Sequence, residues 1–195
     1  MEGISHASTF KDIYLKSEWG IGSGGGSNPE FCAPFVDWLQ SYIRSHSISS
    51  MVDIGCGDLQ WIPTLVKHTG IQYTGIDCVS TLIETHSERY PDMKFISSDI
   101  FHSVNILPDA DLYLIKDVVQ HWPTADIREF IAILKRKSKP GSLILLCNCE
   151  GGGRESRDIK VGEFLALSSR LPPLNEIPHE TVYSWNNKFV IRLIN

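Results

Sequence analysis

Hydrophobic positions along the chain switch between two spacings. Short apolar runs rich in aliphatic and aromatic residues predict buried strands at 50–54, 73–76, 94–97, 112–115 and 143–148. In the longer stretches between the runs, helical character predicts helices at 61–68, 80–90 and 124–137, with a poorly defined one at 101–107. Strands that alternate with helices are typical of βαβ units around a parallel sheet.

The chain before the first strand divides at a glycine-rich stretch. Residues 20–29, GIGSGGGSNP, read as a loop that follows a short polar head. Asn28 or Ser27 can cap a helix that takes Pro29 into its first turn, and Pro34 is expected to kink the start of this helix. We therefore expect residues 1–28 to form an N-terminal segment with a lid or linker, and residues 29–195 to form a single domain.

The pattern changes again near the C-terminus. After a helical stretch at 161–171, two alternating runs, ETVYSW and KFVIRLI, flank an Asn-Asn pair and predict a β-hairpin. The fold prediction is an α/β, three-layer, doubly wound and mostly parallel seven-stranded sheet with an antiparallel C-terminal hairpin.

Composition narrows the classes of function. The 195 residues carry a net charge of −5, and the only dense basic run is at 135–139, which argues against a duplex-DNA binder. The five cysteines are scattered and odd in number, so we expect reduced thiols, and no paired ligands suggest a metal site. The longest apolar run, 143–147, is too short to span a membrane, and residues 1–14 do not resemble a secretory signal. We expect a cytoplasmic protein without a membrane or DNA partner.

The most informative segment is the turn after the first strand. Asp53 is followed by glycines at 55 and 57, which let the backbone approach a ligand closely beside the next helix. Because a carboxylate buried at a strand end is costly, Asp53 is expected to bond backbone N–H groups or a cationic ligand.

Two further acidic residues end the next strands. Asp77 follows Gly55 by 22 residues, the spacing of an acidic residue that binds a ribose diol, and Asp99 ends the third strand. The dinucleotide fingerprint is incomplete because Gln60 occupies its third glycine position, and Asp58 opposes an anionic pyrophosphate. A cationic or neutral nucleoside fits this edge better.

Over residues 48–195 the sequence resembles the class I S-adenosylmethionine-dependent methyltransferases. Five stretches match the motifs of that family in order: VDIGCGD, YTGIDCV, SSDI, DLYLIKDVVQHWP and LKRKSKPGSLILL. The family fold is a seven-stranded sheet with an antiparallel terminal hairpin. The sequence departs from the family's motifs at two places. Asp58 or Leu59, depending on the alignment, replaces a third glycine of the first motif. Cys78 occupies a position where the family often has an aliphatic residue that packs on adenine.

The resemblance implies S-adenosylmethionine as cofactor and assigns residues to it. Asp53, Gly55, Cys56 and Gly57 would surround the methionine part, Asp77 the ribose, and Cys78, Asp99 and Ile100 the adenine, while Lys116, Asp117 and Val118 would line the cavity after the fourth strand.

The residues that contact the methyl acceptor are expected to follow the fourth strand. His121, Asp117 and Lys116 are the candidates for catalysis, and His121, the only histidine expected near the site, has an ordinary pKa of about 6.5, suited to a general base. A packing role for His121 remains the alternative. The acceptor would be enclosed by side chains that include Trp19, Trp61 and Trp122, and by loop 150–157.

Three functions therefore remain. Methyl transfer to a small molecule, or to a protein side chain, is favoured because the acidic charge balance disfavours bulk RNA and the motifs of base-amino methylation are absent. The alternatives are an NAD-dependent oxidoreductase and a non-catalytic subunit that binds S-adenosylmethionine.

Overall fold

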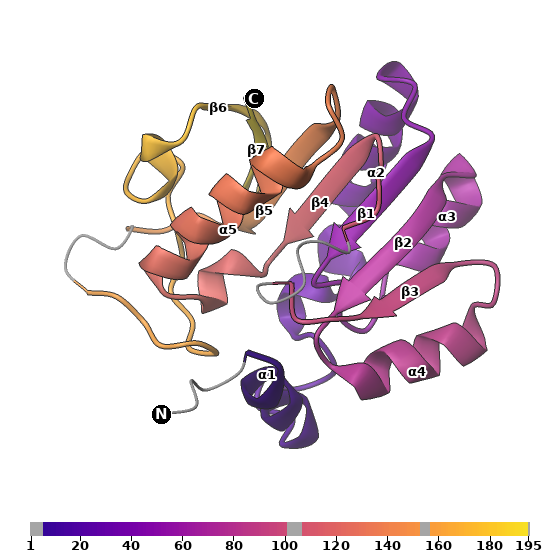
Figure 1. The fold of residues 1–195 in the computed structure, drawn as a ribbon, viewed down its shortest axis with the longest axis horizontal. Helices are drawn as coiled ribbons and strands as arrows, with labels where there is room; N and C mark the ends of the chain where they lie inside the picture. The colour runs from indigo at the N-terminus through magenta and orange to yellow at the C-terminus, as the bar shows by residue number, and fades with distance from the viewer. Residues whose placement is uncertain (1–5, 101–106, 153–156, 195) are drawn as a thin grey trace. The chain divides into compact units, whose positions relative to one another are not determined.

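Seven strands lie in one mixed sheet in a computed structural model of the protein, which describes residues 6–100, 107–152 and 157–194. Their order is β3-β2-β1-β4-β5-β7-β6, and only β6 and β7 run as an antiparallel hairpin (Figure 1). The predicted α/β fold with its terminal hairpin is confirmed. The chain forms two compact units, residues 1–102 and 103–195.

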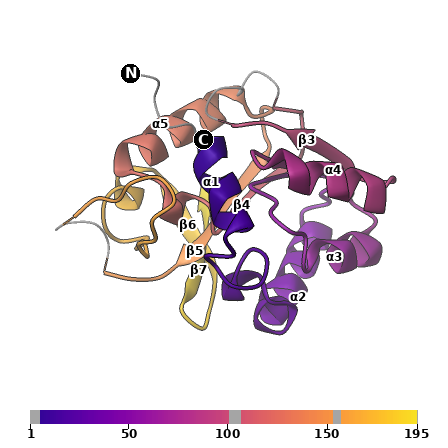
Figure 2. The same ribbon diagram turned by 90° about the horizontal axis from the view of Figure 1, so that it is seen from below.

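The first unit contains three parallel strands with helices packed on them. Its strands are β1 (Ser50–Ile54), β2 (Gln72–Asp77) and β3 (Lys94–Ser97). Its helices are α1 (His6–Leu15), η1 (Gly25–Ser27), α2 (Pro29–Ser45), α3 (Ile62–Thr69) and α4 (Ser80–Arg89). Helix α4 packs along β3, and α2 packs beside α3, in both views (Figures 1 and 2).

The second unit contains two parallel strands and the hairpin. Its strands are β4 (Leu112–Lys116), β5 (Leu143–Cys149), β6 (His179–Trp185) and β7 (Lys188–Leu193). Its helices are η3 (Val119–His121), α5 (Thr124–Lys137) and η4 (Leu174–Glu176). Strand β7 pairs antiparallel with β5, so the first residue of β7 lies beside the last residue of β5.

Helix α2 begins as the sequence predicts. The Asn28 side chain accepts hydrogen bonds from the backbone N–H groups of Glu30 and Phe31 at 2.9 and 3.3 Å, which confirms the cap. Pro29 stands in the first turn, and the helix continues through Pro34 to Ser45.

Two helix predictions need comment. The stretch at 161–171 is not a helix, because Leu167 instead bridges to the end of β5: its N–H donates to the carbonyl of Cys149, and its carbonyl accepts from Gly151. Gly162, with φ 89°, also departs from helical geometry. The predicted piece at 101–107 lies, apart from residue 107, outside the described residues.

Helix α1 was not expected in the polar head. Phe10 and Ile13 are its buried residues, and they supply the small apolar face by which it packs. All five cysteines are free thiols, as predicted. Among the helices of the described residues, none is long and apolar enough to cross a membrane.

Candidate active site

The turn after β1 has the sharp backbone that its glycines predict. Gly55 and Gly57 have φ values of 76° and 58°, and the N–H groups of Gly55 and Cys56 both donate to the carbonyl of Ile76 on β2. Leu59 also has a positive φ, 58°. The turn thus contains a third left-handed residue, and this residue is not a glycine.

Asp53 is held by a neighbouring strand. The Tyr73 hydroxyl on β2 donates to Asp53 Oδ2 at 2.9 Å, and Asp53 is only 3% exposed. Room for this contact comes from Gly75, where a Cβ would lie 3.0 Å from the Tyr73 hydroxyl. A glycine inside a strand signals such a close approach, so Gly75 was the available clue to Tyr73 as the partner of Asp53.

Asp77 is fixed at the end of β2 by two backbone hydrogen bonds. Its Oδ2 accepts from the Gly57 N–H at 2.9 Å and its Oδ1 from the Val79 N–H at 3.0 Å. Burial raises the pKa of the Asp77 carboxyl, although these hydrogen bonds oppose the rise. A carboxylate has about four acceptor positions, so Asp77 can still accept from a ribose diol.

The acidic residues of the three strand ends gather at one edge of the first unit. Burial, together with the nearby carboxylates of Asp77 and Asp53, raises the pKa of the Cys56 thiol. Burial also raises the pKa of the Cys78 thiol, with Asp77 and Asp99 as the neighbouring charges. The carboxylates of Asp53, Asp77 and Asp99 thus lie near these two thiols, and such a group of carboxylates favours a cationic ligand.

A buried polar atom lies just after β3. The Ser98 hydroxyl oxygen is buried and has no hydrogen-bond partner among the described residues, and Ser98 lies between β3 and Asp99. Ile100 follows and is 6% exposed. A buried hydroxyl beside a carboxylate and an apolar side chain fits a heteroaromatic ring that carries an amino group, such as adenine.

His86 was missed by the sequence analysis. Its Nε2 lies 2.7 Å from the carbonyl oxygen of Gly57, and its side chain is buried in α4. The prediction that His121 is the only histidine near the site is therefore wrong. Helix α4 places His86 against the turn, and nothing in the local pattern of this helix indicated that contact.

In the second unit, Lys116 and Asp117 form part of a buried ion cluster. Asp117 contacts the ammonium of Lys116 at 2.7 Å and that of Lys188, the first residue of β7, at 2.5 Å. Burial alone would raise the pKa of Asp117, but the two ammonium groups outweigh burial and hold the pKa below its ordinary value. Asp117 is thus an ion-pair partner of two lysines, and a lowered pKa does not favour a role as general base.

His121 is 8% exposed at the end of η3 and is held by a backbone carbonyl. Its Nδ1 lies 3.2 Å from the carbonyl oxygen of Glu163. Because a carbonyl only accepts hydrogen bonds, this contact places a proton on Nδ1 and makes Nε2 the basic nitrogen of the neutral ring. The ring of the half-exposed Phe164 lies 5.7 Å from the imidazole.

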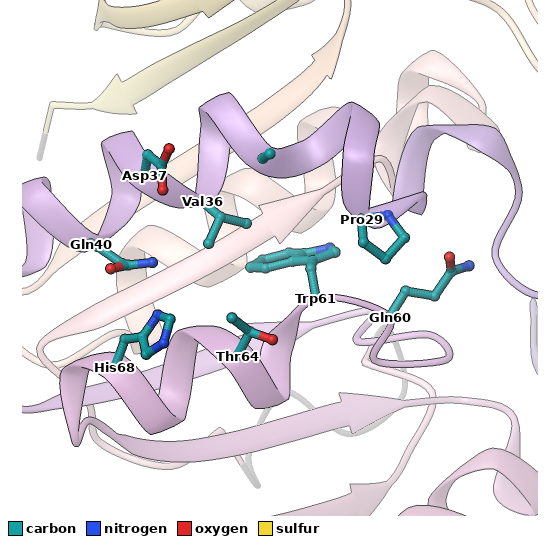
Figure 3. Close-up of a pocket in the computed structure, with 9 residues that line it drawn as sticks. Pro29, Val36, Asp37, Gln40, Gln60, Trp61, Thr64 and His68 are labelled. Carbon is teal, nitrogen blue, oxygen red and sulfur yellow. The ribbon is translucent and has the colours of Figure 1, made fainter.

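The three tryptophans expected around the acceptor lie in separate surroundings. Trp19 packs on Phe10 and Tyr14, and Trp122 is 3% exposed and packs on Phe130. Trp61 lies in a groove of about 350 Å³ between α2 and α3, where Figure 3 shows its indole between the two helices. These placements describe packing contacts, and the roles of the three residues toward an acceptor stay predictions.

Comparison with known proteins agrees with this geometry. Residues 51–141 match a family model described as a methyltransferase domain. O-methyltransferase 9 of Dictyostelium discoideum is 28% identical over 103 residues, which are half of this chain and 28% of that protein.

Solved structures agree on the fold. The complex of DhpI with S-adenosylhomocysteine (SAH) has a TM-score of 0.64 at 11% identity, covering 97% of this chain and 94% of that one. Human N-acetylserotonin methyltransferase, in complex with S-adenosylmethionine (SAM), has a TM-score of 0.61 at 18% identity. The match covers 98% of this chain and 60% of the human chain. Magnesium protoporphyrin IX methyltransferase from Synechocystis PCC 6803, also with bound SAM, has a TM-score of 0.61 at 13% identity and covers 98% of both chains.

The matched stretch begins at β1 and runs to the end of α5, so it contains both the glycine turn and the carboxylates at the ends of the first strands. The seven-stranded sheet and its terminal hairpin are those that the motifs led us to expect. Residues 51–141 thus match the model of a methyltransferase domain, and the fold is that of solved S-adenosylmethionine-dependent methyltransferases.

Proposed function

We propose that the protein transfers a methyl group from SAM to an oxygen atom of a small-molecule acceptor. The observation that carries this proposal is Asp77, whose carboxylate is fixed against the glycine turn by the Gly57 N–H at 2.9 Å. Support for an oxygen acceptor comes from the names of several relatives, which include O-methyltransferase 9 and the mitomycin 7-O-methyltransferase MmcR. The free cysteines fit the cytoplasm as its location.

The residues of the first unit are those that would hold the cofactor. Asp77 would accept from the ribose hydroxyls, and the turn at Gly55, Cys56 and Gly57 would receive the methionine part. Asp99 and Ile100 would take the adenine, beside the buried Ser98 hydroxyl. The bound cofactor supplies an electrophilic methyl group on a sulfonium, and the carboxylates of this edge match its positive charge.

In the second unit, His121 is the residue we propose to take the acceptor's proton. Its Nδ1 contact with the Glu163 carbonyl orients the ring, and a neutral imidazole can act as a general base. The ion cluster of Lys116, Asp117 and Lys188 holds the end of β4 and the start of β7 together. Positioning of donor and acceptor supplies most of the rate, and a base adds typically about 10²–10⁴-fold.

Calorimetric titration with SAM, SAH and NAD tests the cofactor. We expect micromolar binding of both adenosyl ligands, no binding of NAD, and loss of adenosyl binding in Asp77→Ala. Asp111→Asn, a change at an exposed ion pair in the other unit, is the matched control and should bind as the unchanged protein does. Binding of NAD alone would establish the oxidoreductase instead.

A screen of small molecules with SAM carrying a labelled methyl group then tests the acceptor. Label transferred to hydroxyl compounds would support the proposal, and label found only on proteins would favour a side-chain acceptor. Cofactor binding without transfer to any acceptor would support the non-catalytic subunit.

A further inference from the structure

The N-terminal segment, defined here as residues 6–27, rests directly on the glycine turn. The hydroxyls of Tyr14 and Ser23 are hydrogen-bonded at 2.7 Å. A Cβ at Gly57 would lie 2.4 Å from the Ser23 hydroxyl and 3.1 Å from the Tyr14 hydroxyl. Glycine is therefore required at position 57 by the N-terminal segment as well as by the φ of the turn.

Asp58 fastens this segment to the turn at two points. Its Oδ2 accepts from the Ser23 backbone N–H at 2.9 Å, and its own backbone N–H donates to the Ser23 hydroxyl at 3.0 Å. Gln60 supports the carboxylate through a second hydrogen bond to Oδ2 at 2.8 Å. Gly22 leaves space for this arrangement, since a Cβ at this position would lie only 1.7 Å from Asp58 Oδ2.

The N-terminal segment has its own small packed body. Trp19 packs on Phe10 and Tyr14, so α1 and the start of the glycine loop hold together. Gly20 and Gly24, both with φ near 84°, give the loop left-handed positions that other residues rarely adopt.

Tyr14 lies close to the proposed cofactor residues. Burial raises the pKa of its hydroxyl, and the charge that contributes most to the rise is the Asp77 carboxylate, the residue assigned to the ribose. The N-terminal segment thus covers the same turn that would receive the cofactor.

We propose that Asp58 is a positioning residue whose reciprocal hydrogen bonds with Ser23 make the N-terminal segment one wall of the cofactor site. This inference rests on the proposed function. The cofactor enters and leaves when the segment detaches, so the strength of the Asp58–Ser23 contact sets the cofactor's residence time. A segment that merely packs on the surface would leave the residence time unchanged.

The first test is hydrogen exchange of the cofactor-free protein. Asp58→Ala and Ser23→Ala should speed amide exchange in residues 6–27 by about tenfold, the equivalent of one net hydrogen bond to a charged group. Asp58→Asn and Ser23→Thr keep an acceptor or a hydroxyl and should restore slow exchange. Asp12→Asn, at an exposed pair on α1, is the control and should exchange like the unchanged protein. Equal exchange in all variants would overturn the contact's role.

The second test is stopped-flow dissociation of SAH. Asp58→Ala and Ser23→Ala should release SAH about tenfold faster and raise KM for SAM without lowering kcat, while the two conservative variants restore both values. Faster amide exchange with an unchanged rate of SAH release would overturn the proposal that the N-terminal segment forms a wall of the cofactor site. Failure of the unchanged protein to bind SAH would instead overturn the proposed function, and the exchange result would still report on the contact. Ser23→Ala guards against misfolding, because Ser23 lies outside the sheet and its helices.

Discussion

The imidazole of His121 is oriented by one backbone carbonyl, which allows its chemistry to be separated from its packing. Asparagine can place an amide N–H near the position of Nδ1, so His121→Asn keeps a donor toward Glu163 but has no basic nitrogen. We expect kcat to fall by about 10²–10⁴-fold. Steady-state kinetics on an acceptor found by the screen measures this loss.

Binding of SAH serves as the control for His121→Asn. Its affinity should stay the same, because the proposed cofactor residues belong to the first unit. An unchanged kcat would show that His121 only packs its loop and that no base is required at this position.

Asp117 gives a second prediction at the residue scale, on stability. Its carboxylate faces the ammonium groups of Lys116 and Lys188, so Asp117→Asn leaves buried positive charges with a weaker partner. The free energy of unfolding at pH 7 should fall by about 3–5 kcal/mol. Urea unfolding measures the change. Asp111→Asn should cost far less, because its ion pair with Lys139 is exposed.

The difference in the free energy of unfolding between the unchanged protein and Asp117→Asn should depend on pH in one direction. The folded state lowers the pKa of Asp117, so its stabilising effect is complete above the unfolded value of about 3.9 and is lost as the pH falls through the lower folded value. The gap between the unchanged protein and Asp117→Asn should be constant from pH 5 to 8 and should narrow below about pH 4. A gap that varied across neutral pH would contradict the assignment.

Residues near the glycine turn were predictable where their roles are local in sequence. Asp53, Gly55, Gly57 and Asp77 stand at strand ends, and the structure places them together. Their partners were not predictable in this way, since Lys188 reaches Asp117 from 71 positions away and His86 reaches Gly57 from 29. Such contacts depend on packing, which no local pattern encodes.

Between the elements β1 and β2, a buried hydroxyl-carboxylate contact joins the neighbouring strands. Tyr73→Phe removes the donor to Asp53, and we expect the free energy of unfolding to fall by about 1–3 kcal/mol. Chemical denaturation measures the loss, with the half-buried Tyr90→Phe at the end of α4 as the control. Equal stabilities of the two variants would show that the hydroxyl of Tyr73 contributes nothing.

The elements themselves were predictable to different degrees. Each strand predicted from an apolar run exists, and the runs of β1, β4 and β5 left little ambiguity because these strands are almost wholly buried. Strand β3 exists although none of its residues is buried. The stretch at 161–171 has apolar residues at helical spacing, but the backbone of Leu167 pairs with the end of β5 instead. Helix α1 escaped prediction because its buried face is only two residues wide.

At the scale of the whole molecule, cofactor binding should stabilise the fold. A ligand that binds only the folded state adds about 2.7 kcal/mol at 100 times its Kd, which for a chain of this length raises Tm by about 5–10 °C. We expect SAH to produce this shift in a thermal melt. NAD at the same concentration should not, and Asp77→Ala should abolish the shift.

The mostly parallel sheet with its terminal hairpin was predictable because alternating strands and helices followed by a hairpin permit few topologies. The division into two compact units was not, since no change in composition separates residue 102 from residue 103. The expectation of one domain over residues 29–195 stays a prediction.

The position of Lys188 in the last strand has a consequence for synthesis of the chain. The strands of the first unit are complete once residue 97 has been made, so they can pair while translation continues. Asp117 must wait for Lys188, and β5 must wait for β7, until residues 188–193 have been made. During that interval β5 presents an unpaired, strongly apolar edge on the side away from β4, so a pause in translation before residue 188 should expose the nascent chain to aggregation and to chaperones.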